Sequence, residues 1–305
     1  MNHGIPKPNP APVGFAPPKE FVPPEKGERI LCEETGYYIG DFIANGSFGA
    51  VYECTDDWGN NLIAKVLLPQ NKTYEQVKDE WQTELRNLVQ LRHPNITFIY
   101  QAFEYRNTFY LIVERCSFPL ISLIERRNDD GDKWLPYIAR DVLHALDFIH
   151  KLGYVHKDLH PGNIFVSHRY DYMNPSKDRE WSFKIGDLGI SRLAGDMRPA
   201  NTIFAQWMTP PEHLDPAKFG AVGKHIDIYQ TGLLLLSLLL KDIPMFTKKD
   251  IMNGIPSKLA EAFPSPCGKA IAKSLRRHVD DRTPNAIAMW RDISDAITKK
   301  GNKNT

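Results

Sequence analysis

The chain has 305 residues, of which 42% are hydrophobic and 25% are charged, a composition typical of a globular protein with one large core or two smaller ones. Its 38 Lys and Arg residues against 37 Asp and Glu residues leave a net charge of +1. No overall field therefore attracts the chain to nucleic acid or to an anionic membrane, and we expect no nucleic-acid partner.

Three features favour an intracellular location. The longest apolar run, residues 233–240, is too short to cross a bilayer. The beginning of the sequence lacks the basic and apolar regions of a secretory signal. The four cysteines form no C-x-x-C pair, which is typical of reduced thiols: Cys32, Cys54, Cys116 and Cys267. We expect a cytoplasmic protein without a membrane span, with delivery into another cell left open.

The first segment of the chain is rich in proline. Residues 1–24 contain eight of the 23 prolines. Proline cannot donate a backbone hydrogen bond and disfavours helix in the residue before it. We therefore predict a disordered arm over residues 1–28. An alternative interpretation is an extended ligand for an aromatic-lined groove of a partner.

A region rich in β-branched and aromatic residues follows the arm. Short runs separated by Gly, Asn and Asp predict five strands, at residues 37–41, 48–54, 61–68, 97–104 and 108–114. A single helical pattern over residues 75–91 interrupts them.

The remainder of the chain is dominated by helical patterns beyond Leu120. They predict helices at residues 137–152, 226–240, 259–263, 268–278 and 285–299. A strand-rich part followed by a helix-rich part predicts an α+β fold of two lobes with a cleft between them. We place the lobes at residues 29–116 and 117–299, followed by a disordered tail at 300–305.

Two features of the strand-rich part involve charge: a segment that could bind an anion and a lysine in an apolar strand. The segment Ala44-Asn45-Gly46-Ser47-Phe48-Gly49-Ala50-Val51 links two predicted strands, and its glycines let backbone N–H groups approach an anion, although such a segment can also be a simple turn. Lys65 lies among aliphatic residues of the next strand and needs a negative partner to stay charged. Glu84, on the predicted helix, is the candidate partner.

The strongest chemical signal lies in the helix-rich part. It is the run His156-Lys157-Asp158-Leu159-His160-Pro161-Gly162-Asn163, followed 24 residues after its Asn by Asp187. Asp158, Asn163 and Asp187 supply oxygen ligands of the type that Mg²⁺ prefers together with phosphate oxygens.

In this order, the motifs resemble those of the eukaryotic-type protein kinase superfamily, over residues 38–297. The resemblance implies a two-lobed fold with a β-rich N-lobe, one αC helix and a mostly helical C-lobe. It implies an ATP- and Mg²⁺-dependent protein kinase that transfers the γ-phosphate to Ser/Thr hydroxyls of a protein substrate. It assigns nucleotide binding to Ala44, Asn45, Gly46, Ser47, Phe48, Gly49, Val51, Ile63, Lys65, Val113, Glu114, Cys116 and Phe165.

The resemblance also assigns catalytic roles, since phosphoryl transfer depends mainly on positioning and charge neutralisation. Lys65, held by Glu84, would orient the phosphates. Asn163 and Asp187 would hold Mg²⁺, and Asp158 would accept the proton of the attacking hydroxyl. In the C-lobe, residues 156–163 match the catalytic loop. Asp227 matches the residue that braces this loop, and Arg282 matches the partner of Glu212.

Some positions depart from the family pattern. His160 and Ala205 replace a lysine and a threonine that serine/threonine kinases usually carry, and Lys157 replaces an arginine. His160-Pro-Gly-Asn also resembles the loop of small-molecule phosphotransferases, so such an enzyme, or a pseudokinase scaffold, remains the alternative. His160 is either a protonated group that neutralises the transferred phosphoryl or a neutral loop residue bonded to the backbone. Ile63 and Phe165 are large and predict a narrow adenine slot.

Overall fold

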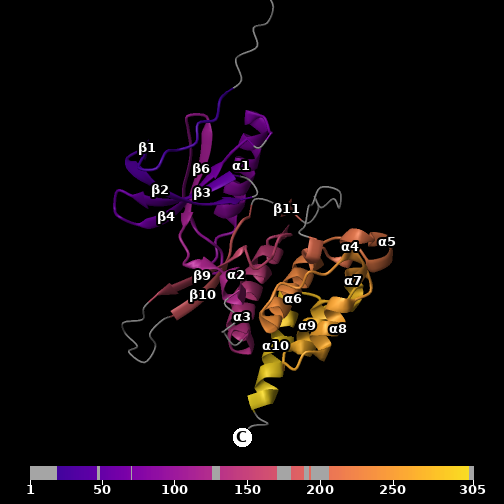
Figure 1. Ribbon diagram of the computed structural model, residues 1–305. Coiled ribbons are helices and arrows are strands. Elements are labelled where there is room, and N and C mark those ends of the chain that lie inside the picture. Colours follow the sequence, from indigo (N-terminus) through magenta and orange to yellow (C-terminus); the bar gives the residue numbers. More distant parts are fainter. Residues whose placement is uncertain are drawn as a thin grey trace, which may run out of the picture.

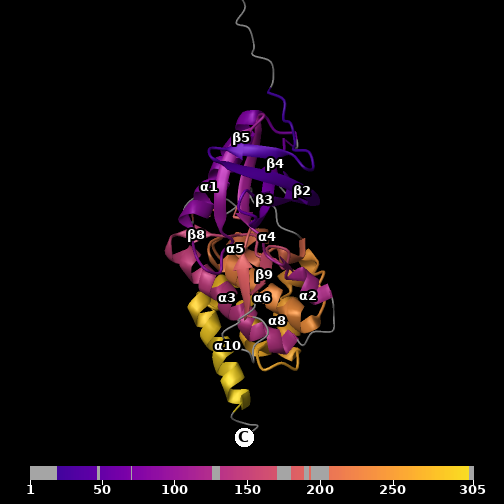
Figure 2. The same cartoon turned by 90° about the vertical axis from the view of Figure 1, so that its left-hand side faces the viewer.

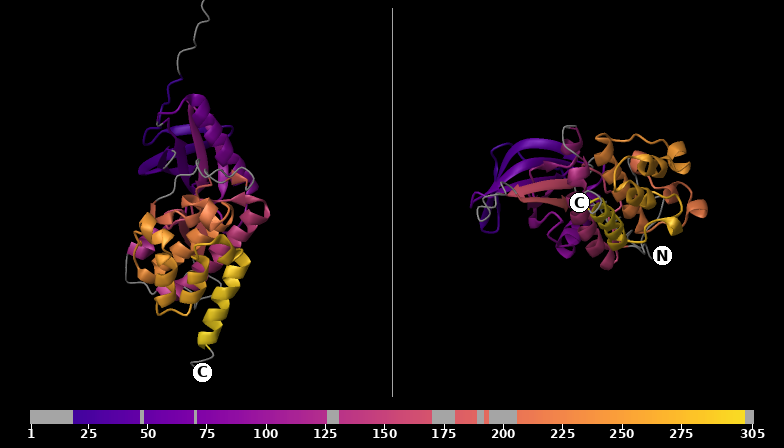
Figure 3. Two further views of the ribbon diagram at one scale, coloured as in Figure 1. Left: turned by 90° about the vertical axis from the view of Figure 1, so that its right-hand side faces the viewer. Right: turned by 90° about the horizontal axis from the view of Figure 1, so that it is seen from below.

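The computed structural model describes residues 19–46, 49–69, 71–125, 131–169, 180–188, 192–193 and 206–301. They form two lobes, with a strand-rich lobe above a helical one (Figure 1). The long C-terminal helix runs down the outside of the helical lobe, as Figures 2 and 3 show. The predicted two-lobed α+β fold is confirmed.

The N-lobe is built on a six-stranded antiparallel sheet in the order β1-β2-β3-β4-β6-β5. Its strands are β1 Arg29–Cys32, β2 Thr35–Gly46, β3 Gly49–Asp56, β4 Asn61–Leu67, β5 Ile99–Tyr105 and β6 Thr108–Glu114. The sequence predicts five of these and misses β1, whose four residues are too few to show an alternating pattern. β2 continues well past the predicted end at residue 41, because register shifts between Ile39 and Ala44 carry the pairing with β3 through this stretch.

One helix, α1 (Tyr74–Gln90), packs against this sheet, as Figure 2 shows. A capping box between Thr73 and Gln76 begins the helix. The indole of Trp81 donates a hydrogen bond to the carbonyl of Tyr110 on β6, at 3.0 Å. The predicted helix at 75–91 is confirmed to within one residue at each end.

Residues 19–28 differ from the predicted disordered arm, because they dock on the N-lobe. The ring of Phe21 lies 6.1 Å from that of Tyr74 and 6.5 Å from that of Phe109. The N–H of Val22 donates to the Thr108 hydroxyl at 2.9 Å. Proline favours an extended backbone but does not prevent it from docking, and Phe21 supplies apolar surface to bury. We call residues 19–28 the docking segment; residues 1–18 lie outside the described residues.

The C-lobe is mostly helical and is organised around α6, whose residues are almost all buried. Among the described residues, none of the helices is both long and apolar enough to cross a membrane. The helices are α2 Ile121–Glu125, α3 Gly131–Lys151, α4 Pro211–Leu214, α5 Pro216–Phe219, α6 His225–Leu240, α7 Lys248–Met252, α8 Ile255–Ala262, α9 Gly268–Ser274 and α10 Ala286–Gly301, with 3₁₀ turns at Gln206–Met208 and Val279–Asp281.

Several helix boundaries differ from the sequence-based ones. α3 begins at Gly131 and includes Pro136, which removes only one helical hydrogen bond near its start. α9 ends at Ser274 instead of 278. α10 extends to Gly301, into the predicted disordered tail; residues 302–305 lie outside the described residues.

Two small sheets position the loops between the lobes. Strands β7 (Phe118–Pro119), β9 (Ile164–Arg169) and β10 (Glu180–Ile185) form a sheet in the order β10-β9-β7, and β8 (Tyr154–Val155) pairs with β11 (Arg192–Leu193). The β9–β10 hairpin projects from the C-lobe in Figure 1. Ile164 pairs with Ile185, so the residues just before β9 and just after β10 lie close together.

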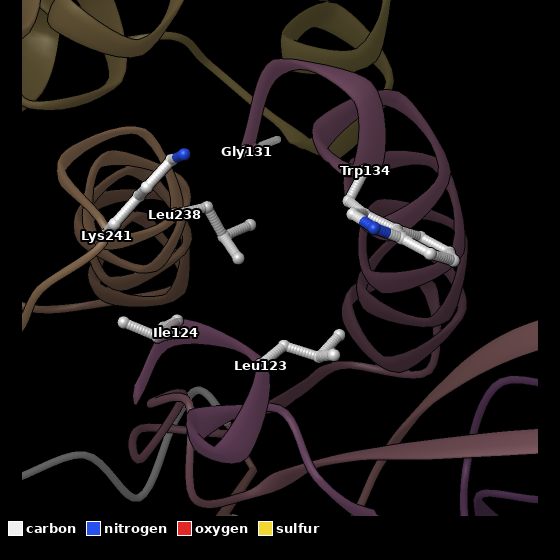
Figure 4. A pocket seen from close by; sticks show the side chains of 6 residues that line it. All are labelled: Leu123, Ile124, Gly131, Trp134, Leu238 and Lys241. Atoms are coloured by element: carbon white, nitrogen blue, oxygen red, sulfur yellow. The ribbon is translucent and has the colours of Figure 1, made fainter. Parts of the chain in front are cut away.

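A small pocket lies between α2, α3 and α6 (Figure 4). A Cβ added at Gly131 would stand 2.2 Å from the carbonyl oxygen of Leu238, so the two helices approach too closely there for any other residue. The pocket is lined by none of the residues predicted to be functional; its lining is Leu123, Ile124, Gly131, Trp134, Leu238 and Lys241.

Candidate active site

Lys65 joins the two lobes through a three-residue ionic cluster. Its Nζ atom lies 2.7 Å from Oε1 of Glu84 on α1 and 3.0 Å from Oδ1 of Asp187, just beyond β10. Burial alone would lower the pKa of Lys65, but the two carboxylates outweigh it and raise the pKa above its usual value. The lysine therefore stays charged although it is mostly removed from solvent, and the predicted partnership with Glu84 is present.

The helix that carries Glu84 is also fixed to the segment after Asp187. The side-chain amide of Asn87 donates to the carbonyl of Leu188 at 2.9 Å. The ring of His156 is hydrogen-bonded to the carbonyl of Gly186 at 3.1 Å. Together these contacts hold the residues on both sides of Asp187, Leu188 to α1 and Gly186 to His156.

Asp158 and Asn163 form the second polar pair of the site. The Nδ2 atom of Asn163 donates to the carbonyl oxygen of Asp158 at 3.0 Å and to its Oδ2 at 3.1 Å. Because the amide nitrogen is used in this way, the amide oxygen of Asn163 is the atom that would hold a metal ion. With the carboxylate of Asp187 it makes a donor set of the kind that Mg²⁺ prefers. Burial raises the pKa of Asp158 above its ordinary value.

His160 lies beside this pair. Its Nδ1 accepts a hydrogen bond from the N–H of Gly162 at 3.0 Å, and its Nε2 lies 3.7 Å from Oδ2 of Asp158. An imidazolium carries a hydrogen on both nitrogens and could not accept this bond. Burial lowers the pKa of His160, against the opposing effect of Asp158. The geometry thus favours the neutral interpretation over the protonated one.

Three of the residues assigned to nucleotide binding, Val51, Ile63 and Val113, lie on the same face of the N-lobe sheet as Lys65. Val51 is the cross-strand partner of Lys65, and Ile63, two residues before Lys65, is the partner of Val113. Side chains two residues apart on a strand, and directly opposite each other, point to the same side. This face therefore carries the lysine and the large Ile63 together.

The phosphate loop is described in part. Ala44, Asn45 and Gly46 pair with Val51, Ala50 and Gly49 at the end of the β2–β3 hairpin, while Ser47 and Phe48 lie outside the described residues. A Cβ at Gly49 would stand 1.9 Å from the carbonyl oxygen of Val66, so glycine is required there for the packing of β3 on β4.

Glu114, the last residue of β6, forms an ion pair with Lys184 of β10 that the sequence analysis did not predict. Both carboxylate oxygens of Glu114 accept from Nζ of Lys184, at 2.7 and 2.9 Å. The N–H of Glu114 donates to the carbonyl of Phe98 at 2.8 Å, so this N–H is not available to a nucleotide. Burial raises the pKa of the Cys116 thiol to about 12. In the sequence, Lys184 could have been identified only by its position three residues before Asp187.

Phe165 lies against the backbone just before Asp187. A Cβ at Gly186 would stand 2.5 Å from an edge carbon of the Phe165 ring. The large aromatic residue is thus accommodated by a glycine opposite it.

The catalytic loop is held from below by α6. The carboxylate of Asp227 accepts from the N–H of His156 at 2.9 Å and from that of Lys157 at 2.8 Å, as predicted. Burial alone would raise the pKa of Asp227, but the hydrogen bond from His150 and the nearby histidines hold it below its usual value. The predicted pair of Arg282 and Glu212 is fully buried, with contacts of 2.7 and 2.8 Å.

This fold, with a partly buried strand lysine paired to a buried helix glutamate above an Asp–Asn–Asp site, defines a phosphotransferase of the kinase type. The protein kinase domain matches residues 37–292, and the chain belongs to that family.

The chain is similar to curated protein kinases at low identity. It is 26% identical over 276 residues to the cell cycle serine/threonine-protein kinase CDC5/MSD2 of Saccharomyces cerevisiae, covering 87% of this chain and 37% of the yeast protein. It is 26% identical over 288 residues to the serine/threonine-protein kinase plk-2 of Caenorhabditis elegans, covering 90% and 43%. A calcium/calmodulin-dependent protein kinase type 1 of Macrobrachium nipponense is 27% identical over 225 residues, covering 73% and 61%. The chain thus spans less than two thirds of the length of each of these relatives.

Proposed function

We propose that the protein is an ATP- and Mg²⁺-dependent kinase that transfers the γ-phosphate to Ser/Thr hydroxyls of protein substrates. The observation that carries this proposal is the position of Lys65 between Glu84 and Asp187, next to the Asp158–Asn163 pair. A charged lysine, a carboxylate base and two oxygen ligands for a metal are the groups that phosphoryl transfer needs.

Each group has a defined task in this scheme. Lys65 keeps its charge and orients the α- and β-phosphates. Asp158, oriented by the amide of Asn163, accepts the proton of the attacking hydroxyl. Asn163 and Asp187 would hold Mg²⁺, which would neutralise charge on the phosphates when bound. Neutral His160 lies beside this carboxylate, with its Nε2 3.7 Å from Oδ2 of Asp158, too far for a hydrogen bond.

A protein substrate is favoured over a small molecule by the C-lobe. The Glu212–Arg282 pair and the Asp227 brace belong to the protein-kinase part of the sequence pattern, and both are fully formed. The relatives named above are serine/threonine kinases or a calmodulin-dependent kinase, which supports Ser/Thr acceptors.

Location and partners are proposed on separate grounds. All four cysteines are free, which supports a cytoplasmic location. A groove-type partner of the proline-rich arm would bind residues 1–18, because the docking segment already packs on the N-lobe.

The test is a transfer assay with purified chain, labelled ATP, Mg²⁺, generic protein substrates and a panel of small alcohols. Asp158→Asn should reduce kcat about 10²- to 10⁴-fold, because it removes the base. Asp147→Asn is the matched control, since Asp147 pairs only with Lys151 along α3. Transfer confined to small alcohols would replace the proposal with a small-molecule phosphotransferase, and nucleotide binding without any transfer would indicate a pseudokinase.

A further inference from the structure

A buried glutamine on α6 grips the catalytic loop on both sides of Asp158. Gln230 lies one turn after Asp227 and is fully buried. Its Oε1 accepts from the N–H of Leu159 at 3.0 Å, and its Nε2 donates to the carbonyl of Lys157 at 2.9 Å. The residues immediately before and after Asp158 are therefore both fixed by one side chain.

The backbone conformation of Lys157 explains why the loop needs these two hydrogen bonds. Lys157 has a φ of 75°, in the left-handed region that a non-glycine residue adopts only when its surroundings enforce it. Its N–H is held by Asp227 at 2.8 Å and its carbonyl by Gln230 at 2.9 Å. Two side chains one helical turn apart thus hold both ends of the strained residue that aims Asp158.

The choice of glutamine is chemically specific. A carboxamide offers one acceptor and one donor at a fixed separation, and this site uses both. A glutamate would place an acceptor against the Lys157 carbonyl, and an aliphatic side chain would leave two buried backbone groups unpaired.

We propose that Gln230 is a positioning residue of the kinase reaction, which acts by holding the carboxylate of Asp158 in its productive orientation. This inference rests on the proposed function, because it assigns Asp158 the role of the base.

The first test compares Gln230→Leu, close in volume but without polar atoms, with the matched control Ser237→Ala. Ser237 is equally buried on the same helix, about two turns beyond Gln230, and its hydroxyl donates to the Leu233 carbonyl within the helix. Gln230→Leu should reduce kcat about 10- to 100-fold, as a misplaced catalytic group does, with the KM for ATP unchanged. Ser237→Ala should keep both values. An unchanged kcat in Gln230→Leu would overturn the inference.

A double variant separates positioning from general loss of stability. In the Asp158→Asn background, adding Gln230→Leu should lower kcat no further, because the group it positions is already absent. A full additional loss would show that Gln230 acts elsewhere and would refute the inference. If the leucine variant does not fold, Gln230→Asn takes its place, since its side chain is one methylene shorter and cannot reach both backbone groups.

Amide hydrogen exchange provides a readout that does not depend on activity. The Leu159 amide should exchange faster in the variant than in the wild type, while the amides of α6 keep their protection. Unchanged exchange at Leu159 would overturn the inference. A wild-type chain without phosphoryl transfer would instead remove the proposed function, and exchange would still decide whether Gln230 holds the loop.

Discussion

Arg282 is expected to be one of the most sensitive positions in the C-lobe. Its guanidinium uses all five of its N–H donors. Two bond to the Glu212 carboxylate at 2.7 and 2.8 Å, and three bond to the carbonyls of Arg276, His225 and Arg277 at 3.0, 3.0 and 3.3 Å. Removing this side chain would leave the fully buried Glu212 without its counter-ion.

Arg282→Met should therefore cost about 3–5 kcal/mol of unfolding free energy, the range for a broken buried ion pair. Adding Glu212→Gln should recover part of this loss, because the buried charge is gone. Recovery should be incomplete, since three backbone carbonyls still lack their donor.

The assay is urea unfolding of the wild type, Arg282→Met and the double variant, with Arg29→Met as control. Arg29 pairs with Asp57 at the surface, where water screens the interaction, so its loss should cost only a small fraction of the Arg282 value. Equal costs at the two positions would refute the reasoning. A double variant as unstable as Arg282→Met would show that the carbonyl bonds, and not the charge, dominate.

Three further outcomes are expected. Burial raises the pKa of Asp158 and lowers that of His160, so kcat should fall as pH is lowered through the pKa of Asp158, with no second decrease on the alkaline side. An alkaline decrease that His160→Gln abolishes would show that the imidazolium is required. Gly162→Ala should reduce kcat about 10-fold, because the new Cβ would stand 2.8 Å from the His160 ring. Gly223→Ala is the control and should have no effect, because the space around Gly223 is open. Equal activities of the two variants would contradict the expected role of Gly162. Phe21→Ala should destabilise the N-lobe by about 1–3 kcal/mol through lost apolar contacts, seen as a lower Tm in a thermal melt; an unchanged Tm would mean that the docking segment contributes no stability.

The sequence predicts the polar centre of the site well because chemistry restricts those positions. A lysine among aliphatic residues needs a counter-ion, which pairs Lys65 with Glu84, and an Asp–Asn–Asp spacing suits a metal, which groups Asp187 with Asp158 and Asn163. The contact between Lys65 and Asp187 was not predicted. The resemblance to kinases supplied the order in which they meet.

What the sequence does not show depends on three-dimensional contacts. The neutral state of His160 follows from one backbone N–H, that of Gly162, which no residue pattern reveals. Gln230 stands in an apolar helix, where a single amide gives no periodic signal. The packing of the docking segment was not predicted, because its proline content indicates only a preference for extended backbone. Composition does not show that Phe21 contacts aromatic residues of the N-lobe.

The docking segment joins the N-terminus of the chain to the catalytic ion pair. Phe21 contacts Tyr74, the first residue of α1, and Glu84 lies ten residues further along the same helix, about 15 Å away. A ligand of residues 1–18 that binds better when Phe21 is undocked would loosen the start of this helix. Binding at the two sites would then be linked. If a bound nucleotide tightens the Lys65–Glu84 contact, it would lower the affinity for that ligand by the same factor by which the ligand lowers the affinity for the nucleotide.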